Sequence, residues 1–300
     1  MDDKTFSGFL DTWIPEHKDE MVQSLLGLLK IDSVGAPPLD GKPFGAEVDK
    51  AIQYFIAEAE KYGMKTKNVD GYAAHAEIGA GDEMAMTLTH VDIVPAGTGW
   101  DHDAFGEVYE GVIYGRGTTD NKGPTVASLF ALRALKEAGV PLKRRVRHVV
   151  GGNEESGFRC VRHYFEVEEQ PTYGFSPDAG FPLVFAEKGS MNVQIEFELP
   201  EALSGGATCR LAELYGGERP NIVASKGVAV LEVPAGTEKH IVKDLEGHIQ
   251  AARDFTGGPG PLEIEIEVES GKVTVTAKGK AAHAATPQEG TNALTALAYV

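Results

Sequence analysis

The chain has 300 residues, of which 42% are hydrophobic and 24% are charged, and this composition excludes a disordered or fibrous protein. Its formal net charge of -17 disfavours nucleic acid and anionic membranes, so we expect neither as a partner. The 2 cysteines are too few for a disulfide framework or a thiolate zinc site, so His, Asp and Glu would have to hold any metal.

The sequence also carries information on location and size. The N-terminus lacks the basic and then apolar pattern of a secretory signal, and no apolar run approaches the roughly 20 residues that cross a bilayer. We therefore expect a cytoplasmic protein. A chain of this length can form one large domain or two.

The first half of the sequence predicts strands that alternate with helices. Its expected elements are helices at residues 17–30 and 46–62, a hairpin at 65–78, a buried strand at 84–89, a hairpin at 107–114, a helix at 124–138, a strand at 145–150, a helix that ends near 166 and a strand at 172–176. This order is typical of an α/β domain, in which ligands bind beyond the carboxyl ends of the strands.

The second half has a different pattern. Apolar and polar residues alternate at 191–199, 262–268 and 273–277, which predicts strands, and a helix is expected at 239–255. Antiparallel strands combined with helices favour a separate α+β domain that starts near residue 188. We therefore predict two domains, residues 1–187 and residues 188–300.

A histidine and an aspartate mark the end of the strand at 84–89. Side chains of a strand alternate between its faces, so His90 and Asp92 would project to the same side. Asp92 could then accept the second ring N–H of His90 and fix its tautomer, as happens around metal-binding histidines. The alternative is a polar transition from strand to loop.

Four further acids occupy loops that follow strands or precede helices. Asp120 lies in a glycine-rich loop before a helix, Glu154 and Glu155 follow one strand, and Asp178 follows another. Each has a local structural alternative, namely a helix N-cap, favourable charge at a helix start, or a turn aspartate. Their coincidence with His90 at one edge of the predicted sheet indicates a metal site.

These residues, in this order, resemble the motifs of the di-zinc peptidases related to aminoacylase and glutamate carboxypeptidase. The motifs are Thr-His-x-Asp ending at Asp92, Gly-Arg-Gly-x-x-Asp ending at Asp120, Asn-Glu-Glu ending at Glu155, Ser-Pro-Asp-Ala-Gly-Phe-Pro around Asp178, and Lys-Ala-Ala-His-Ala around His283. The residues within these motifs are most similar to those of the bacterial Xaa-His dipeptidase (PepV) branch. The likeness runs from about residue 8 to the last residue.

The resemblance implies an α/β catalytic domain with a mixed, largely parallel sheet flanked by helices, together with an inserted α+β lid domain. It also implies a last histidine ligand, the rest of the lid and a returning catalytic segment beyond Val300. We therefore expect this chain to be the N-terminal part of a longer enzyme.

The resemblance implies two Zn²⁺ ions, and the same ligands would also suit Mn²⁺ or Co²⁺. His90 and Asp178 would bind one ion and Glu155 the other, with Asp120 between them.

The remaining roles are also implied by the resemblance. Glu154 would be the general base, and Asp92 would orient His90. On the lid, His283 would stabilise the oxyanion and contact the substrate, and Asn221 would contact the substrate only. The lone histidine at 283 also has a plain alternative as an exposed loop residue.

The expected activity is that of a metal-dependent dipeptidase. It would hydrolyse the peptide bond of a dipeptide with a free N-terminus, using a metal-bridging water and Glu154 as the general base, and the full-length protein would be a monomer. Two alternatives remain open: a related di-zinc amidohydrolase that deacylates N-acyl amino acids, and a catalytically silent binding protein on the same scaffold.

Overall fold

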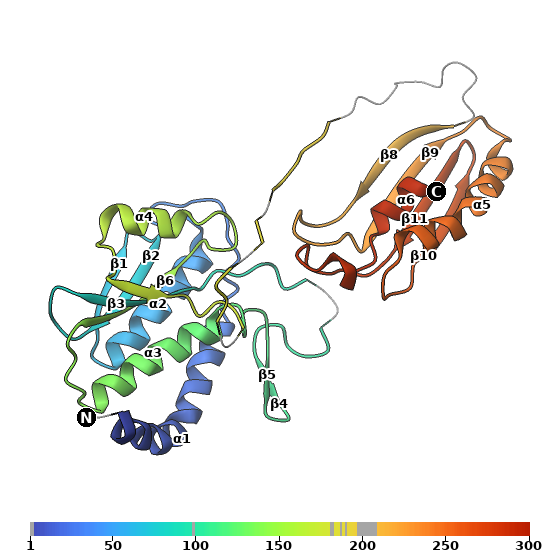
Figure 1. The fold of residues 1–300 in the computed structure, drawn as a ribbon. Coiled ribbons are helices and arrows are strands. Elements are labelled where there is room, and N and C mark those ends of the chain that lie inside the picture. Colours follow the sequence, from blue (N-terminus) through green and yellow to red (C-terminus); the bar gives the residue numbers. More distant parts are fainter. Residues whose placement is uncertain (1–2, 98–99, 181–182, 187, 190, 197–208) are drawn as a thin grey trace. The chain divides into compact units, whose positions relative to one another are not determined.

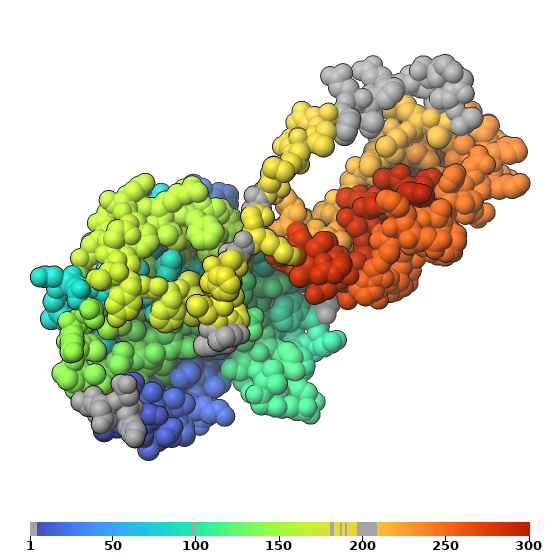
Figure 2. All heavy atoms as spheres, in the orientation of Figure 1, coloured from blue at the N-terminus to red at the C-terminus, as the bar shows by residue number. Residues whose placement is uncertain are grey.

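The computed structural model describes residues 3–97, 100–180, 183–186, 188–189, 191–196 and 209–300, and the other residues are drawn in grey in Figures 1 and 2. The chain forms two compact units, Met1–Val184 and Phe185–Val300, called unit 1 and unit 2 below. Their assignment as catalytic and lid domains stays a prediction. Within the described ranges, no helix combines the length and apolar character needed to cross a bilayer.

Unit 1 is built on a five-stranded sheet with the strand order β1-β2-β6-β3-β7. The β1–β2 and β2–β6 pairs are antiparallel, whereas the β6–β3 and β3–β7 pairs are parallel. The expected mixed α/β fold is confirmed. The strands are β1 (Lys65–Val69), β2 (Ala73–Ile78), β3 (Met84–His90), β6 (Arg145–Gly151) and β7 (Tyr173–Phe175), and β4 (Glu107–Tyr109) and β5 (Val112–Tyr114) form a separate hairpin.

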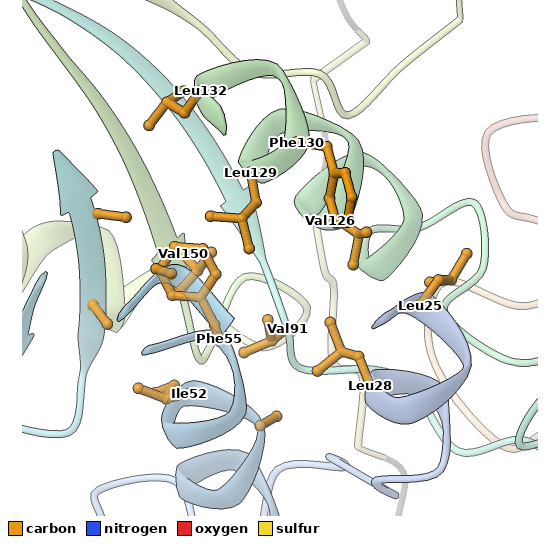
Figure 3. Close-up of a cluster of buried hydrophobic side chains, with 14 of the residues drawn as sticks. Leu25, Leu28, Ile52, Phe55, Val91, Val126, Leu129, Phe130, Leu132 and Val150 are labelled. Carbon is orange, nitrogen blue, oxygen red and sulfur yellow. The ribbon is translucent and has the colours of Figure 1, made fainter. Parts of the chain in front are cut away.

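Helices cover both faces of this sheet (Figure 1). They are α1 (Asp3–Leu29), α2 (Ala46–Lys61), α3 (Lys122–Glu137) and α4 (Arg159–Val167). The first three share one hydrophobic core because each carries apolar residues at helical spacing. Leu28, Phe55 and Leu129, one from each helix, all point into this core in Figure 3. Tyr164 of α4 packs in a second cluster with Met84 and Met86 of β3.

Helix α1 starts at Asp3, whereas the sequence predicted a start near residue 17. The expectation failed because Pro15 interrupts the helical pattern, and tertiary contacts outweigh that local preference. Trp13 is buried, and its indole Nε1 donates to Glu137 Oε2 on α3 at 2.6 Å. Its ring also packs edge-on against Phe130.

Unit 2 contains a four-stranded antiparallel sheet in the order β10-β11-β9-β8. Its helices, α5 and α6, pack on one face of this sheet around Val273 and Val275 (Figure 1). The elements are β8 (Arg210–Gly216), β9 (Lys226–Glu232), α5 (Glu238–Thr256), β10 (Glu263–Glu269), β11 (Lys272–Lys278), the short 3₁₀ helix η1 (Pro287–Glu289) and α6 (Ala293–Tyr299).

Two expectations for unit 2 need correction. The alternating segment predicted as a strand has no regular secondary structure over residues 191–196, and residues 197–199 lie outside the described ranges. Alternation indicates a strand only where a partner strand is available, and none pairs with 191–196 among the described residues. Strands β8 and β9 were not predicted. Strand β9 is buried over four consecutive residues and so shows no alternation.

We predict that Leu129→Ala lowers the free energy of unfolding of unit 1 by about 2–5 kcal/mol, because it leaves a cavity in a core where Leu129 is 2% exposed. Both tryptophans of the chain, Trp13 and Trp100, lie in unit 1, so denaturant unfolding followed by tryptophan fluorescence reports this unit alone. Leu39→Ala is the matched control, with an expected change within about 0.5 kcal/mol at a side chain that is 58% exposed. Equal effects of the two variants would contradict the assigned core.

Candidate metal centre

Three parallel strands of unit 1 end at the same edge of the sheet. His90 is the last residue of β3 and pairs with Gly151, the last residue of β6. The chain then leads from β6 to Glu154 and Glu155, and from β7 to Asp178. Because β3, β6 and β7 run in the same direction, the loops that follow them meet beyond their carboxyl ends.

The imidazole of His90 lies at the centre of a group of carboxylates. Its Nε2 is 3.0 Å from Asp120 Oδ1, 3.6 Å from Asp178 Oδ2 and 3.8 Å from Glu154 Oε2. His90, Asp120 and Glu155 offer ligand atoms within 4.8 Å of one another, and so do His90, Glu154 and Asp178. All five predicted residues therefore meet in one place. His90, rather than Asp120, is common to both groups, so the distribution of ligands between two ions stays a proposal.

Asp92 contacts two parts of the site. His90 Nδ1 is 3.0 Å from the main-chain oxygen of Asp92 and 3.4 Å from its carboxylate Oδ1. The two carboxylate oxygens accept the main-chain N–H groups of Glu154 and Glu155 at 3.0 and 3.1 Å. The sequence suggested only the contact with His90. Asp92 therefore ties the loop after β6 to the end of β3, in addition to facing the histidine.

Burial and the neighbouring charges shift the pKa values of several side chains in the site. Burial disfavours the charged form of His90, but hydrogen bonds to Asp120 and Asp92 outweigh this and raise its pKa to about 11. Burial raises the pKa of Glu154 to about 7, and it also raises the pKa of Glu155 and of Asp178. The hydrogen bond with His90 lowers the pKa of Asp120. The site therefore favours an added positive charge, and the imidazole is where a proton is held most strongly.

The donor set fits divalent metal ions. The contact of Nδ1 with a main-chain oxygen keeps a proton on that nitrogen, so a metal ion would replace the proton on Nε2, which faces the acids, and take Nε2 as its ligand atom. One imidazole nitrogen with carboxylate oxygens suits Zn²⁺, Mn²⁺ or Co²⁺. Cys160 is buried, and neither of these two metal-ligand groups contains a cysteine.

The sequence analysis did not identify the residues that support these metal ligands through hydrogen bonds. Asn121 donates to Asp178 Oδ1, and the hydroxyl of Thr125 lies within hydrogen-bonding distance of the main-chain oxygens of His90 and Asn121. Lys122 is fully buried, and its Nζ donates to the main-chain oxygens of Leu28 and Ile31. The sequence signals were the position of Asn121 and Lys122 directly after Asp120 and the presence of Lys122 in the motif Gly-Arg-Gly-x-x-Asp-x-Lys-Gly. Their burial is a tertiary property that no local pattern reveals.

The two residues predicted on the lid lie in unit 2, where adjoining segments bring them together. Ile222 and His283 form an isolated antiparallel bridge, and Ala284 N donates to the main-chain oxygen of Asn221 at 2.8 Å. His283 is exposed, and its Nδ1 accepts from Ala285 N at 3.1 Å. Their roles towards a substrate stay predictions.

A family model, described as peptidase family M20/M25/M40, matches residues 86–298. The chain belongs to this family. The match confirms the resemblance found in the sequence, and it includes the end of β3 and the loops that carry all five residues of the metal centre.

Curated relatives of this M20/M25/M40 chain include "Putative dipeptidase YtjP" of Bacillus subtilis, which is 38% identical over 92% of the chain and 58% of its own length. "Putative dipeptidase SH1171" of Staphylococcus haemolyticus is 35% identical over 93% of the chain and 58% of its own length. The chain thus spans less than two thirds of these relatives. Among solved structures, the dipeptidase Dug1p of Saccharomyces cerevisiae matches 91% of the chain and 72% of its own length at 14% identity, with a TM-score of 0.47.

We predict that divalent metal ions stabilise unit 1. Ions at about a hundred times their Kd should raise its free energy of unfolding by about 2.7 kcal/mol, because they bind the assembled cluster and not the unfolded chain. Tryptophan fluorescence in denaturant, with Zn²⁺, Mn²⁺ or a chelator, measures the difference.

Asp178→Ala should remove most of this gain, whereas Asp19→Ala, at an exposed acid on α1, should retain it. A gain of the same size in the Asp178 variant would show that the ions bind elsewhere.

Proposed function

We propose that this chain carries the metal centre and the general base of a dipeptidase that hydrolyses the peptide bond of dipeptides with a free N-terminus. The observation that carries the proposal is the convergence of His90 with four carboxylates at the edge where β3, β6 and β7 end. Family membership and the printed names of the relatives support the reaction class.

Each residue of the cluster has a proposed role. His90 and Asp178 would hold one ion, Glu155 the other, and Asp120 both. Two bound divalent ions supply positive charge that acidifies a shared water and polarises the scissile carbonyl. Zn²⁺ is the proposed metal, and Mn²⁺ and Co²⁺ fit the same donors.

Glu154 is the proposed general base. It lies at the cluster, 3.8 Å from His90 Nε2, and its side chain remains 28% exposed, so that solvent can reach it. Glu154 would take a proton from the attacking water and deliver it to the leaving amine, so that the carboxylate is regenerated when the peptide bond has broken. Asp92 supports this role because its carboxylate accepts the main-chain N–H of Glu154. This hydrogen bond holds the backbone of Glu154 in place.

His283 and Asn221 are proposed to contact the substrate from unit 2. The main-chain bridge between their segments supports a common task, since a displacement of one segment would displace the other. His283 would donate to the oxyanion as negative charge develops, and one such donor contributes about 2.7–4 kcal/mol to transition-state stabilisation. The whole protein would act in the cytoplasm, and it would be a monomer, as the family resemblance suggests.

We predict that Glu154→Gln in the intact protein retains bound metal but lowers kcat by about 10²–10⁴-fold, because it removes the proton acceptor and keeps the shape of the side chain. Asp120→Ala should lose both metal and turnover. Metal content by elemental analysis and hydrolysis of a dipeptide are the two measurements. The control is Glu166→Gln at an exposed acid of α4, which should change neither. An unchanged kcat in the Glu154 variant would refute its assignment as the base.

The free N-terminus of the substrate gives a second test. N-acetylation of a dipeptide should lower kcat/KM by about a hundredfold or more, because it removes a positive charge that the acidic site attracts and adds bulk. Paired assays of one dipeptide and its N-acetyl form measure the ratio. A preference for acetylated substrates would instead identify an amidohydrolase that deacylates N-acyl amino acids.

A further inference from the structure

Asn121 lies directly behind the proposed metal ligands. Its side chain is fully buried, and its amide Nδ2 is 2.6 Å from Asp178 Oδ1 and 3.1 Å from the main-chain oxygen of Pro177. Both neighbours are hydrogen-bond acceptors, so the nitrogen of the amide, rather than its oxygen, must face them. The amide thus donates both of its N–H groups to the segment that carries Asp178.

This contact divides the two oxygens of Asp178 between different tasks. Oδ1 accepts from Asn121, whereas Oδ2 is the oxygen that lies 3.6 Å from His90 Nε2. A free carboxylate could rotate and exchange its oxygens. With Oδ1 held at 2.6 Å, the plane of the carboxylate is fixed and Oδ2 is directed into the cluster.

The start of α3 is itself immobilised on both sides of this contact. Thr125 Oγ1 lies 2.9 Å from the main-chain oxygen of Asn121 and 3.2 Å from that of His90. Lys122, the next residue in the chain, donates from a buried Nζ to the main-chain oxygens of Leu28 at 3.2 Å and Ile31 at 2.7 Å. Asn121 therefore belongs to a rigidly held segment at the start of α3, and this segment also contacts His90 at the end of β3.

The environment of the amide oxygen of Asn121 is evidence against a purely structural role. Asn121 Oδ1 is buried and has no hydrogen-bond partner among the residues that the structure describes. A buried acceptor without a partner costs stability. An apolar side chain of similar size would avoid this cost, so the benefit of an amide here lies in the two N–H groups that it directs at Asp178 and Pro177.

We propose that Asn121 is a positioning residue of the metal centre, which fixes Asp178 in the orientation that binds a divalent ion. Because Asn121 follows Asp120 in the chain, one short segment sets the geometry of two ligands that come from different loops. This inference rests on the metal site proposed above. Donors behind a ligand carboxylate commonly change metal affinity by about 10–100-fold when they are removed.

The test is the affinity of the intact protein for Zn²⁺ and Co²⁺, measured by calorimetry and by the visible absorption of bound Co²⁺. Asn121→Ala should weaken the binding of one ion by about 10–100-fold and alter the Co²⁺ spectrum, because the Asp178 carboxylate is no longer held. The matched control is Tyr164→Phe, which removes a buried hydroxyl that contacts His75 and Arg147 away from the site. It should cost stability but leave affinity and spectrum unchanged.

A second comparison tests whether Asn121 acts through Asp178. In an Asp178→Ala background, Asn121→Ala should produce no further loss of affinity, since its partner is already absent. A full additional loss in that background would overturn the proposal. The proposal would also be overturned if the single variant Asn121→Ala had the same metal affinity and Co²⁺ spectrum as the unchanged protein.

Two outcomes separate the inference from its foundation. If the unchanged protein binds no divalent ion, the proposed metal site itself is wrong. If it binds ions and Asn121→Ala does not fold, Asn121→Ser takes its place, as it keeps a small polar group without the amide N–H donors. If neither variant folds, or if Asn121→Ser binds metal normally, Asn121 has a structural role only and the inference is wrong.

Discussion

The mutual repulsion of four carboxylates around one buried imidazole is the constraint on which unit 1 depends. Two like charges 4 Å apart at the edge of a protein oppose each other by about 4 kcal/mol, so the cluster would spread apart unless the fold held it. The raised pKa of His90 expresses this excess of negative charge, whereas the raised pKa of Glu154 comes mainly from burial, with a smaller contribution from the neighbouring acids. A divalent cation relieves this repulsion, which is why we interpret the cluster as a metal centre.

Strands and hydrogen bonds of unit 1 hold the carboxylates in place against this repulsion. Parallel strands bring His90 and Asp178 to one edge, and the carboxylate of Asp92 fastens the loop that follows β6. From the opposite side, the first turn of α3 supports Asp178 through Asn121. Ligands from separate loops thus keep their places because hydrogen bonds link each loop to its neighbours.

Local pattern was enough to predict the strand that ends at His90 and the polar loops after β6 and β7, because an apolar run followed by acids is visible along the chain. The convergence of those loops followed from the parallel order of the strands. The fully buried Asn121 and Lys122 could not be predicted, because their partners lie far away in the sequence. The N-terminal half of α1 and the strand expected at 191–199 failed for a related reason, since tertiary partners decide whether such segments become regular.

The most direct measurement is anomalous diffraction from crystals of the protein that contain Zn²⁺ or Mn²⁺. The account predicts two anomalous peaks roughly 3.5–4 Å apart, each within bonding distance of side chains from the group His90, Asp120, Glu155 and Asp178. Metal peaks away from this group, in crystals where these side chains are ordered, would contradict the account.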